Sequence, residues 1–469
     1  MFARAHRLVK TVVLLLVLST IRSADAQDTL NTHIDGFVRA EMQRQHLPGV
    51  AIGIVKNGVI VKAQGYGYAN LEHQVEAGPA TIFQSGSVGK QITAMAVMLQ
   101  VEDGKLSLSD PLTKFFPEAP EAWRSITVYH LLTHTSGIPE YDDGTFDYRK
   151  DHTEDDLARF ACALPLEFPA GARWSYSNTG YALLGIIVHK VSGSFYGDVL
   201  AARVFKPLGM TTARVISEAD IIPNRAAGYR LVNGEVKNQE WVAPVTNTTA
   251  DGCLYVSLRD LIAWDAGVRG RALLKPESWN LILQPVRLNS GRSYPYGFGW
   301  ALDERGGQPL HQHGGGWQGF RSQFSRYIGE DLSIIVLANL AAADPARIAD
   351  GIAEIMNPKL AVPAAHPIVD REPEVTARLS RLLDEARAGT LAPGAFAYVR
   401  AGFFPNGARR IQKRLLRLGP VQRLVLVERR ELGDDRVYTY EVAFGDRTVV
   451  YTAALAPDGR LTQFRIWEK

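Results

Sequence analysis

The chain has 469 residues, and its 52 Lys and Arg against 49 Asp and Glu leave a formal net charge of +3. Such an even balance excludes the strong positive field expected of a nucleic-acid-binding or anionic-membrane-binding protein. The length allows two or three domains. The two cysteines, Cys162 and Cys253, do not make a disulfide framework and lack metal-site spacing, so the alternatives are one bridge or two separate buried thiols.

Residues 1–26, MFARAHRLVKTVVLLLVLSTIRSADA, have the pattern of a cleavable secretory signal. Basic residues precede the short apolar run TVVLLLVL, and the segment ends in the small residues ADA, so we expect cleavage after Ala26. The apolar run is shorter than the roughly 20 residues that an uncleaved membrane anchor needs. No later segment has the pattern of a membrane span. The mature protein is therefore predicted to be periplasmic or secreted.

The next predicted elements are a helix, a hairpin and a second helix. Residues 28–47 carry apolar positions at helical spacing and end before LPG. VAIGIV and VIVKAQGYGYA then flank Asn57-Gly58, and Asn-Gly between two β-rich runs is a strong hairpin signal. The segment FQSGSVGKQITAMAVMLQVEDG, which contains Ser87, predicts an apolar helix closed by Gly104.

Helical stretches and Pro/Gly loops alternate from there to about residue 240. Strand patterns return later, as YGFGWAL (296–302), FRSQFSRY (320–327) and LSIIVLANL (332–340), and ARIADGIAEIM (346–356) predicts a helix. Strands at both ends of a helical middle indicate a mixed α/β, α+β-like layer structure with a mostly helical insertion.

The segment 357–375 contains four prolines and no periodicity, which predicts a linker over residues 358–370. Two helical patterns and four strand patterns follow, separated by Gly-Asp or Asp-Gly turns. We therefore expect a catalytic domain over residues 27–357 and a separate small α+β domain over residues 371–469.

The spacing of Ser87 and Lys90 is the first chemical signal. The helix that carries Lys90 is apolar nearly all round, so it belongs in the core. An isolated buried ammonium is very costly, and such a lysine needs polar partners or a lowered pKa. Ser87 lies three residues away on the same face, beside free backbone N–H groups that could stabilise an oxyanion. The alternative is that Ser87 only caps the helix and Lys90 reaches solvent.

A second proton-transfer group is expected in a Tyr-x-Asn pattern, which occurs at Tyr68 and at Tyr176. Tyr68 lies in the predicted hairpin, where an alternating tyrosine is ordinary sheet packing. Tyr176 precedes an apolar helix, and a phenol there can project into a cleft. An N-cap function of Ser177 or Asn178 is the alternative, but Tyr176 is the preferred candidate.

A third signal is HQHGGGWQGFRSQF, in which three glycines follow His313. Glycines before a strand allow a backbone edge to approach a ligand closely. His313 could donate a hydrogen bond, or a charge when protonated, to a substrate carboxylate. A histidine with a purely structural part in a Gly-rich turn is the alternative.

SVGK, YSN and HGG, in this order, resemble the three motifs of the penicillin-recognising serine enzymes. The most similar group contains class C β-lactamases, D,D-carboxypeptidases, D-aminopeptidases and β-lactamase-fold esterases. The resemblance covers roughly residues 30–357 and extends to connecting text: HLLTHTSGIP (130–139), YSNTGYALLG (176–185), FKPLGMTTAR (205–214) and VLANL (336–340).

The resemblance implies a β-lactamase/transpeptidase-like fold, an antiparallel sheet flanked by helices beside a helical subdomain. It implies that Ser87 becomes acylated while Lys90 and Tyr176 share proton transfer; which of the two is the base is disputed for such enzymes. The substrate would be a small molecule or a peptide, and no metal or organic cofactor is needed.

The remaining site residues also come from the resemblance. Asn178 would hold Lys90 and a substrate amide, while His313, Gly315 and Gly316 would line the substrate site. The oxyanion hole would be formed by the backbone N–H groups of Ser87 and Gly316.

Two departures from the family pattern affect the expected substrate. His313 replaces the lysine of class C β-lactamases, which favours an esterase, D-amino-acid peptidase or D,D-carboxypeptidase over an efficient β-lactamase. Cys253 replaces a common glycine. The C-terminal domain resembles cystatin-like or nuclear-transport-factor-like domains. The alternative to an exported serine hydrolase is a non-catalytic penicillin-binding or peptidoglycan-sensing protein.

Overall fold

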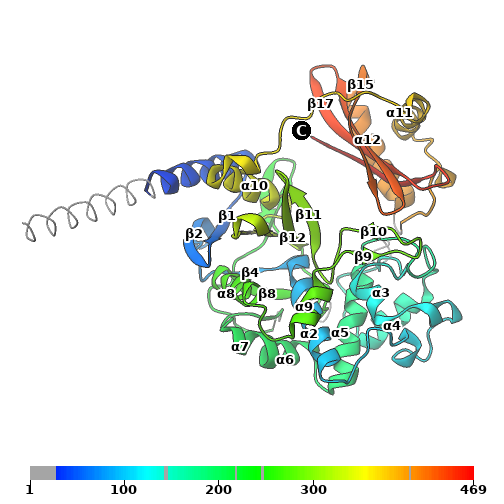
Figure 1. Ribbon diagram of the computed structural model, residues 1–469. Helices are drawn as coiled ribbons and strands as arrows, with labels where there is room; N and C mark the ends of the chain where they lie inside the picture. The colour runs from blue at the N-terminus through cyan, green and yellow to red at the C-terminus, as the bar shows by residue number, and fades with distance from the viewer. Residues whose placement is uncertain (1–27, 142–145, 217–218, 245–247, 401–402, 469) are drawn as a thin grey trace, which may run out of the picture.

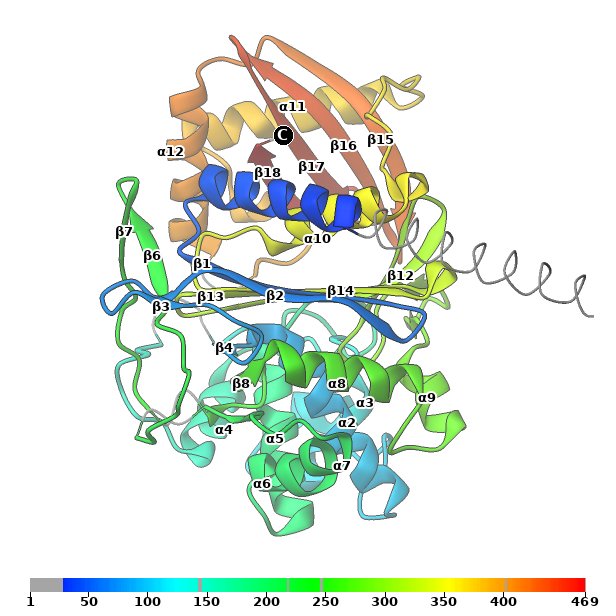
Figure 2. The ribbon, with the colours of Figure 1, turned by 90° about the vertical axis from the view of Figure 1, so that its left-hand side faces the viewer.

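A seven-stranded antiparallel sheet forms the centre of residues 28–357, the part of the chain expected to be catalytic and called the catalytic part below. The strand order is β11-β12-β13-β14-β1-β2-β3 (Figures 1 and 2). The computed structural model describes residues 28–468 except 142–145, 217–218, 245–247 and 401–402. The predicted signal segment, residues 1–26, lies outside the described residues. The strands of this sheet are β1 (Gly49–Lys56), β2 (Val59–Asn70), β3 (Val75–Glu76), β11 (Ala301–Arg305), β12 (Gln308–Trp317), β13 (Phe320–Tyr327) and β14 (Leu332–Ala338).

Helices cover both faces of the sheet. The helix over residues 28–45 and α10 (Pro345–Met356) lie on one face, and α8 (Leu258–Arg269) lies on the other (Figure 2). Every residue of β14 is buried, because this central strand is covered from both sides, and all of its residues except Ser333 are apolar. The central sheet therefore separates two hydrophobic cores.

The helical subdomain lies beyond α8, and smaller sheets connect it to the rest. Its helices are α2 (Gly89–Glu102), α3 (Val128–Leu132), α4 (Glu154–Ala163), α5 (Asn178–Ser192), α6 (Tyr196–Leu200) and α7 (Lys206–Leu208), with α9 (Pro276–Ile282) beside them. The short strands are β4 (Ile82–Gln84), β5 (Arg214–Val215), β6 (Tyr229–Val232), β7 (Glu235–Asn238), β8 (Leu254–Ser257), β9 (Val286–Arg287) and β10 (Ser293–Tyr294).

Most elements predicted for the catalytic part are confirmed. The hairpin turns at Asn57 and Gly58, which both have positive φ, as a two-residue turn of this sequence requires. The strand predicted over residues 296–302 is wrong, because β11 begins only at Ala301. The preceding segment packs too closely for a regular strand: Gly299 has a φ of 77° and its backbone lies directly against Lys90.

The C-terminal part consists of two helices against a four-stranded antiparallel meander (Figure 1). The elements are α11 (Pro373–Ala388), α12 (Ala408–Leu418), β15 (Arg423–Leu432), β16 (Asp435–Phe444), β17 (Arg447–Leu455) and β18 (Leu461–Glu468). It has a hydrophobic core of its own, drawn only from residues of this part. No helix or strand is present over 361–370.

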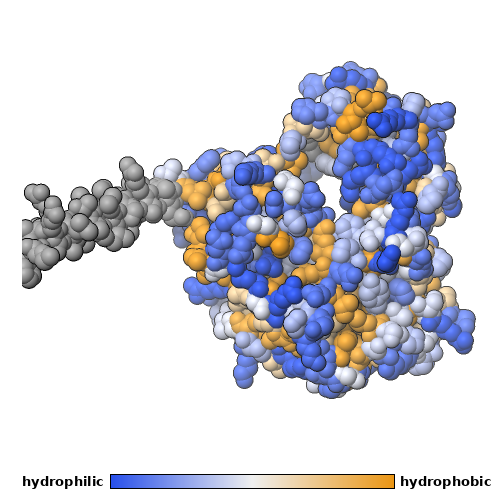
Figure 3. All heavy atoms as spheres, viewed as in Figure 1, coloured by the Kyte–Doolittle hydropathy of each residue, from blue (hydrophilic) through white to orange (hydrophobic). Residues whose placement is uncertain are grey.

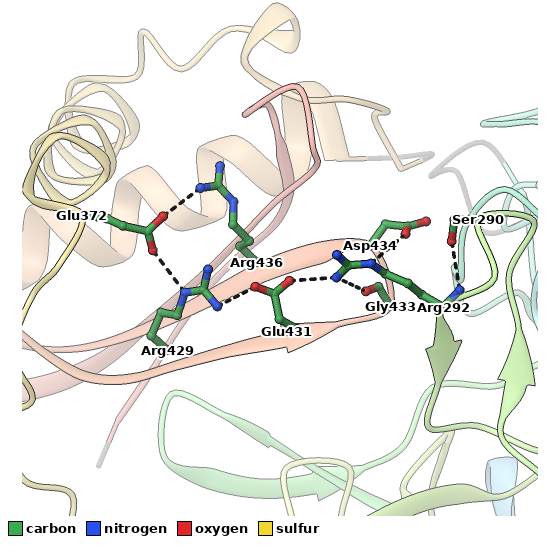
Figure 4. A network of polar contacts seen from close by, with 8 residues as sticks. All are labelled: Ser290, Arg292, Glu372, Arg429, Glu431, Gly433, Asp434 and Arg436. Carbon is green, nitrogen blue, oxygen red and sulfur yellow. Dashed lines mark hydrogen bonds and ion pairs between the residues drawn. The ribbon is translucent and has the colours of Figure 1, made fainter.

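The C-terminal part is docked on the catalytic part by charged contacts. Arg292, on the loop between β9 and β10, donates to Glu431 at 3.1 Å and to the backbone carbonyl of Gly433 at 3.4 Å. Figure 4 shows how this contact continues through Arg429 to Glu372. Figure 3 shows that the two parts touch on one side and leave an opening on the other. The docking surface is therefore mainly polar at this edge.

Two further sequence expectations are addressed by the fold. Cys162 and Cys253 are both free thiols, so the structure has two separate cysteines and no bridge between them. In the described part of the chain, no helix is long and apolar enough to cross a membrane.

Candidate active site

Ser87 lies in a single 3-10 turn, Gly86–Val88, between β4 and α2. Gly86 has a φ of 51°, and a Cβ atom on it would lie 2.4 Å from the backbone nitrogen of Gly316. Only glycine fits both this conformation and this contact. The turn therefore brings the nucleophile candidate against strand β12.

Lys90 is fully buried in the first turn of α2, and all of its partners belong to the same site. Its Nζ atom donates to Ser87 Oγ at 3.1 Å and to Asn178 Oδ1 at 2.6 Å. A third bond goes to the backbone carbonyl of Asp251. Burial lowers the pKa of Lys90 to about 8, although the carboxyl groups of Asp251 and Glu140 oppose the shift. The lysine is thus satisfied and easily deprotonated.

Tyr176 immediately precedes α5, whose N-terminus is capped by Ser177. The Lys90 ammonium lies 4.9 Å from the centre of the Tyr176 ring. Burial raises the pKa of Tyr176 well above its ordinary value, although a hydrogen bond with the Ser87 hydroxyl opposes the shift. Tyr176 is therefore a protonated phenol at neutral pH. Tyr68, by contrast, is a partly exposed residue of β2.

The other side of Tyr176 is held by a hydrogen-bonded chain of rings. The His134 ring lies tilted against the Tyr176 ring, with the ring centres 4.3 Å apart, and its Nδ1 atom accepts from the backbone N–H of Ser177. Its Nε2 atom is therefore protonated and donates to the Tyr296 hydroxyl at 3.2 Å. That hydroxyl in turn donates to Nε2 of His313 at 2.9 Å.

The ring of His313 is turned into the protein. Its Nδ1 atom donates to the backbone carbonyl of Gly314 at 2.6 Å, so both ring nitrogens are engaged. Burial and the nearby Lys90 charge lower the pKa of His313 to about 4. His313 is neutral at physiological pH, and direct donation to a substrate would require it to give up one of these bonds.

Asn178 is oriented by Glu140, a residue that sequence reasoning did not select. Glu140 accepts from the backbone N–H of Asn178 at 2.8 Å and from its Nδ2 atom at 3.4 Å. The amide oxygen of Asn178 is consequently directed at Lys90. Burial raises the pKa of Glu140 to about 7, while Arg400, Lys90 and the Asn178 N–H act in the opposite direction.

Gly315 and Gly316 lie on the free edge of β12, because β11 pairs with this strand only as far as Gln312. A Cβ atom on Gly315 would lie 2.1 Å from the carbonyl oxygen of Ser85 and 3.1 Å from the backbone nitrogen of Ser87. Main chain thus packs on main chain here. This contact places the two predicted oxyanion donors, the N–H groups of Ser87 and Gly316, beside one another.

A cavity of about 540 Å³ opens at Ser87. Its lining comes from widely separated parts of the chain and includes Ser87, Glu140, Asn178, Cys253, Gly316 and Arg400. Among the residues described by the structure, no group of three or more His, Cys, Asp or Glu could hold a metal ion.

The structure brings Ser87, Lys90, Tyr176 and Asn178 together, as the sequence motifs predict. The residues that sequence reasoning missed are Glu140, His134, Asp251, Tyr296 and Arg400. His134 lies within the segment HLLTHTSGIP (130–139), which carries part of the family resemblance, and Glu140 follows it directly. A histidine and a glutamate in a short loop that contains glycine and proline could have indicated a functional site. No local sequence pattern marks Arg400.

Known proteins are similar to this chain over most of its length. A family model described as Beta-lactamase matches residues 34–356. Penicillin-binding protein 4* of Bacillus subtilis (strain 168) is 30% identical over 60% of this chain and 68% of its own length. A D-aminopeptidase of Gluconobacter oxydans (strain 621H) is 28% identical over 72% of this chain and 63% of its own length. The chain thus spans about two thirds of these relatives.

Two solved structures have the same fold at low identity. The octameric penicillin-binding protein homologue from Pyrococcus abyssi has a TM-score of 0.61 at 24% identity, covering 93% of this chain and 96% of that one. The D-amino acid amidase from Ochrobactrum anthropi SV3, complexed with D-phenylalanine, has a TM-score of 0.61 at 24% identity, covering 71% and 98%.

The architecture confirms the predicted β-lactamase/transpeptidase-like fold class, with Ser87, Lys90 and Tyr176 close together in the cavity. The chain belongs to the β-lactamase family of serine hydrolases.

The close packing of Gly315 predicts a large effect of Gly315→Ala on activity. The new Cβ atom must push β12 away from Ser87, which removes one oxyanion donor and should lower kcat by roughly 10²- to 10³-fold. Gly314→Ala is the matched control, because its Cβ would meet the flexible side chain of Gln323 at 3.2 Å and the backbone oxygen of Ser322 at an ordinary 3.9 Å. Steady-state kinetics with a chromogenic ester would measure both. Equal losses in the two variants would contradict this account of the oxyanion hole.

Proposed function

We propose that the protein is an exported serine hydrolase that cleaves an amide or ester through an acyl-enzyme on Ser87. The observation that carries the proposal is the bond of 3.1 Å between Lys90 Nζ and Ser87 Oγ, made by a lysine whose pKa is lowered to about 8. A nucleophilic serine beside an amine that can lose its proton near neutral pH is an activated pair.

The surroundings of the pair favour Lys90 as the base. In the neutral amine, two N–H groups can stay bonded to Asn178 Oδ1 and the Asp251 carbonyl, which leaves the lone pair facing Ser87. Tyr176 keeps its proton because its pKa is raised well above the ordinary value. Tyr176 is accordingly assigned the transfer of a proton to the leaving group rather than the first abstraction.

The reaction then follows in two stages. Lys90 takes the proton of Ser87 as Oγ bonds to the carbonyl carbon, and the N–H groups of Ser87 and Gly316 bind the oxyanion. The bond to the leaving group breaks as Tyr176 protonates it, and the proton on Lys90 restores Tyr176. Water repeats the sequence on the acyl-enzyme, with Ser87 as the leaving group.

The proposed acyl donors are small esters or amides, including amides of D-amino acids and D,D-peptides. Efficient hydrolysis of β-lactams is not expected. The neutral ring of His313 leaves strand β12 without a positive charge at the position where the resemblance expects a lysine. The names of the relatives, penicillin-binding protein and D-aminopeptidase, support an amide-cleaving or acyl-accepting site.

Export to the periplasm or beyond the cell is part of the same proposal. It depends on the pattern of residues 1–26, in which a basic start, a short apolar run and ADA imply cleavage after Ala26. We also retain the division into a catalytic domain, residues 27–357, and a small C-terminal α+β domain, residues 371–469. The cystatin-like or nuclear-transport-factor-like character of the latter stays a prediction.

Covalent labelling tests the proposal directly. A serine-directed fluorophosphonate should modify Ser87, as located by peptide mass spectrometry, and Ser87→Ala should lose both the label and ester turnover. The substitution removes a single hydroxyl, so the melting temperature should change little. A wild-type protein without an adduct at Ser87 would refute the hydrolase and favour a non-catalytic penicillin-binding or peptidoglycan-sensing protein.

The two Tyr-x-Asn patterns provide a matched pair of variants. Tyr176→Phe should lower kcat by roughly 10²- to 10⁴-fold, the usual contribution of a positioned acid–base group. Tyr68→Phe should have little effect, because Tyr68 is 40% exposed on β2. In the wild type, kcat/KM should rise with pH as Lys90, whose pKa is about 8, loses its proton. Activity that falls over this range would exclude Lys90 as the base.

The neutral state of His313 predicts the substrate preference. The wild type should turn over p-nitrophenyl acetate better than nitrocefin, and His313→Lys should raise the nitrocefin-to-ester ratio of kcat/KM roughly tenfold, the effect of one charged hydrogen bond. His311→Lys is the control, since His311 lies on the same strand at a half-buried position. A ratio that is high in the wild type, or that His313→Lys leaves unmoved, would contradict the assignment.

A further inference from the structure

Arg400 belongs to the C-terminal part, yet it lines the same cavity as Ser87. Its guanidinium donates to the backbone carbonyl of Tyr176 at 3.0 Å and lies 3.5 Å from Oε1 of Glu140. The segment that carries it is anchored on the catalytic part, because the Tyr398 ring packs edge-on against Phe168 at 5.4 Å. Arg400 is therefore held in the active site by contacts on both sides.

From Arg400 a continuous polar path leads to the nucleophile. Arg400 pairs with Glu140. Glu140 in turn accepts hydrogen bonds from the backbone N–H and the side-chain Nδ2 of Asn178, which orient the Asn178 side-chain amide. The oxygen of that amide accepts from Lys90, which in turn donates to Ser87. A second branch runs from Arg400 directly to the main chain of Tyr176. The Arg400 guanidinium is thus connected to both proposed proton-transfer residues, to Lys90 through Glu140 and Asn178 and to Tyr176 through its backbone.

The polar path depends on the negative charge of Glu140, because this carboxylate holds Asn178. The carboxylate form accepts from both Asn178 N–H groups with a full negative charge, whereas a protonated carboxyl accepts more weakly and can present an O–H donor to the amide. Four groups face Glu140 from different elements: Arg400, Lys90 of α2, the Asn178 N–H of α5, and Asp251 before β8. The first three favour the carboxylate, whereas burial and Asp251 oppose it.

We propose that the C-terminal domain is part of the active site, and that Arg400 is a positioning residue that holds Glu140 and the Tyr176 main chain for catalysis. This inference depends on the proposed function, since it concerns the same acylation at Ser87. It assigns the C-terminal domain a direct contribution to turnover, beyond any part in stability or in assembly.

The test compares Arg400→Ala with Arg292→Ala in the full chain. Both variants remove an arginine that joins the two parts, but Arg292 contacts Glu431 at the docking edge in Figure 4 and does not line the cavity at Ser87. Arg400→Ala should lower kcat roughly ten- to hundredfold, because the acid–base groups lose their alignment. Arg292→Ala should stay within about twofold of the wild type, the expectation for an exposed ion pair.

A pH profile separates positioning from a merely structural effect. Loss of the Arg400 charge raises the pKa of Glu140 further, towards that of Lys90, so that both groups limit kcat/KM and its pH of half-maximum should move upward. The profile of Arg292→Ala should not move. Arg400→Lys keeps the positive charge but loses the planar guanidinium that bonds two acceptors at once. It should therefore show the wild-type pH midpoint and a kcat between those of Arg400→Ala and the wild type. Melting temperatures would identify any variant that fails to fold.

The outcomes distinguish this inference from the proposed function. If Ser87→Ala is inactive while Arg400→Ala matches Arg292→Ala in both kcat and pH midpoint, the positioning by Arg400 is refuted and the hydrolase stands. If Arg400→Ala fails to fold, Arg400→Lys decides: an unchanged midpoint with reduced kcat supports the inference, and kinetics identical to the wild type overturn it. Turnover that survives Ser87→Ala refutes the proposed function itself.

Discussion

The buried amine of Lys90 is the interaction on which the rest of the site depends. A lone ammonium in a hydrophobic core is prohibitively costly, so the fold must surround it with acceptors. It does so with one side chain from α5, one backbone carbonyl from the loop before β8, and the hydroxyl of Ser87. The same burial that demands these partners also lowers the pKa of Lys90 to about 8. Structural cost and chemical usefulness therefore have one cause.

Glycines make this arrangement possible, because two segments of main chain must approach closely. Gly86 and Gly315 allow the turn with Ser87 to lie directly against β12. A side chain at either position would separate the two oxyanion donors. The free edge of β12 serves the same purpose, since strand β11 ends its pairing at Gln312 and leaves the following residues open to the cleft.

The position of a residue in the sequence does not settle what its side chain contacts, as His313 and Arg400 both show. The family pattern directs attention to His313 as a substrate contact, but its two ring nitrogens are occupied by Tyr296 and by the carbonyl of Gly314. Arg400 lines the same cavity as Ser87, although it lies more than three hundred residues further along the chain. The C-terminal part thus contributes a residue to the lining of that cavity.

The sequence by itself determined the hairpin at Asn57-Gly58, strands β13 and β14, helix α10, the C-terminal meander and the association of Ser87, Lys90, Tyr176 and Asn178. The secondary-structure elements follow from local periodicity and turn chemistry, the Ser87–Lys90 pair follows from its spacing, and the association with Tyr176 and Asn178 follows from the family resemblance of the three motifs. Only the tertiary structure decided that residues 296–300 are not a strand, that His313 faces inward, and that Glu140 and Arg400 join the site. Those outcomes depend on contacts between segments far apart in the chain, such as Gly299 against Lys90 or Arg400 against Glu140, and no local pattern encodes which distant segments will meet.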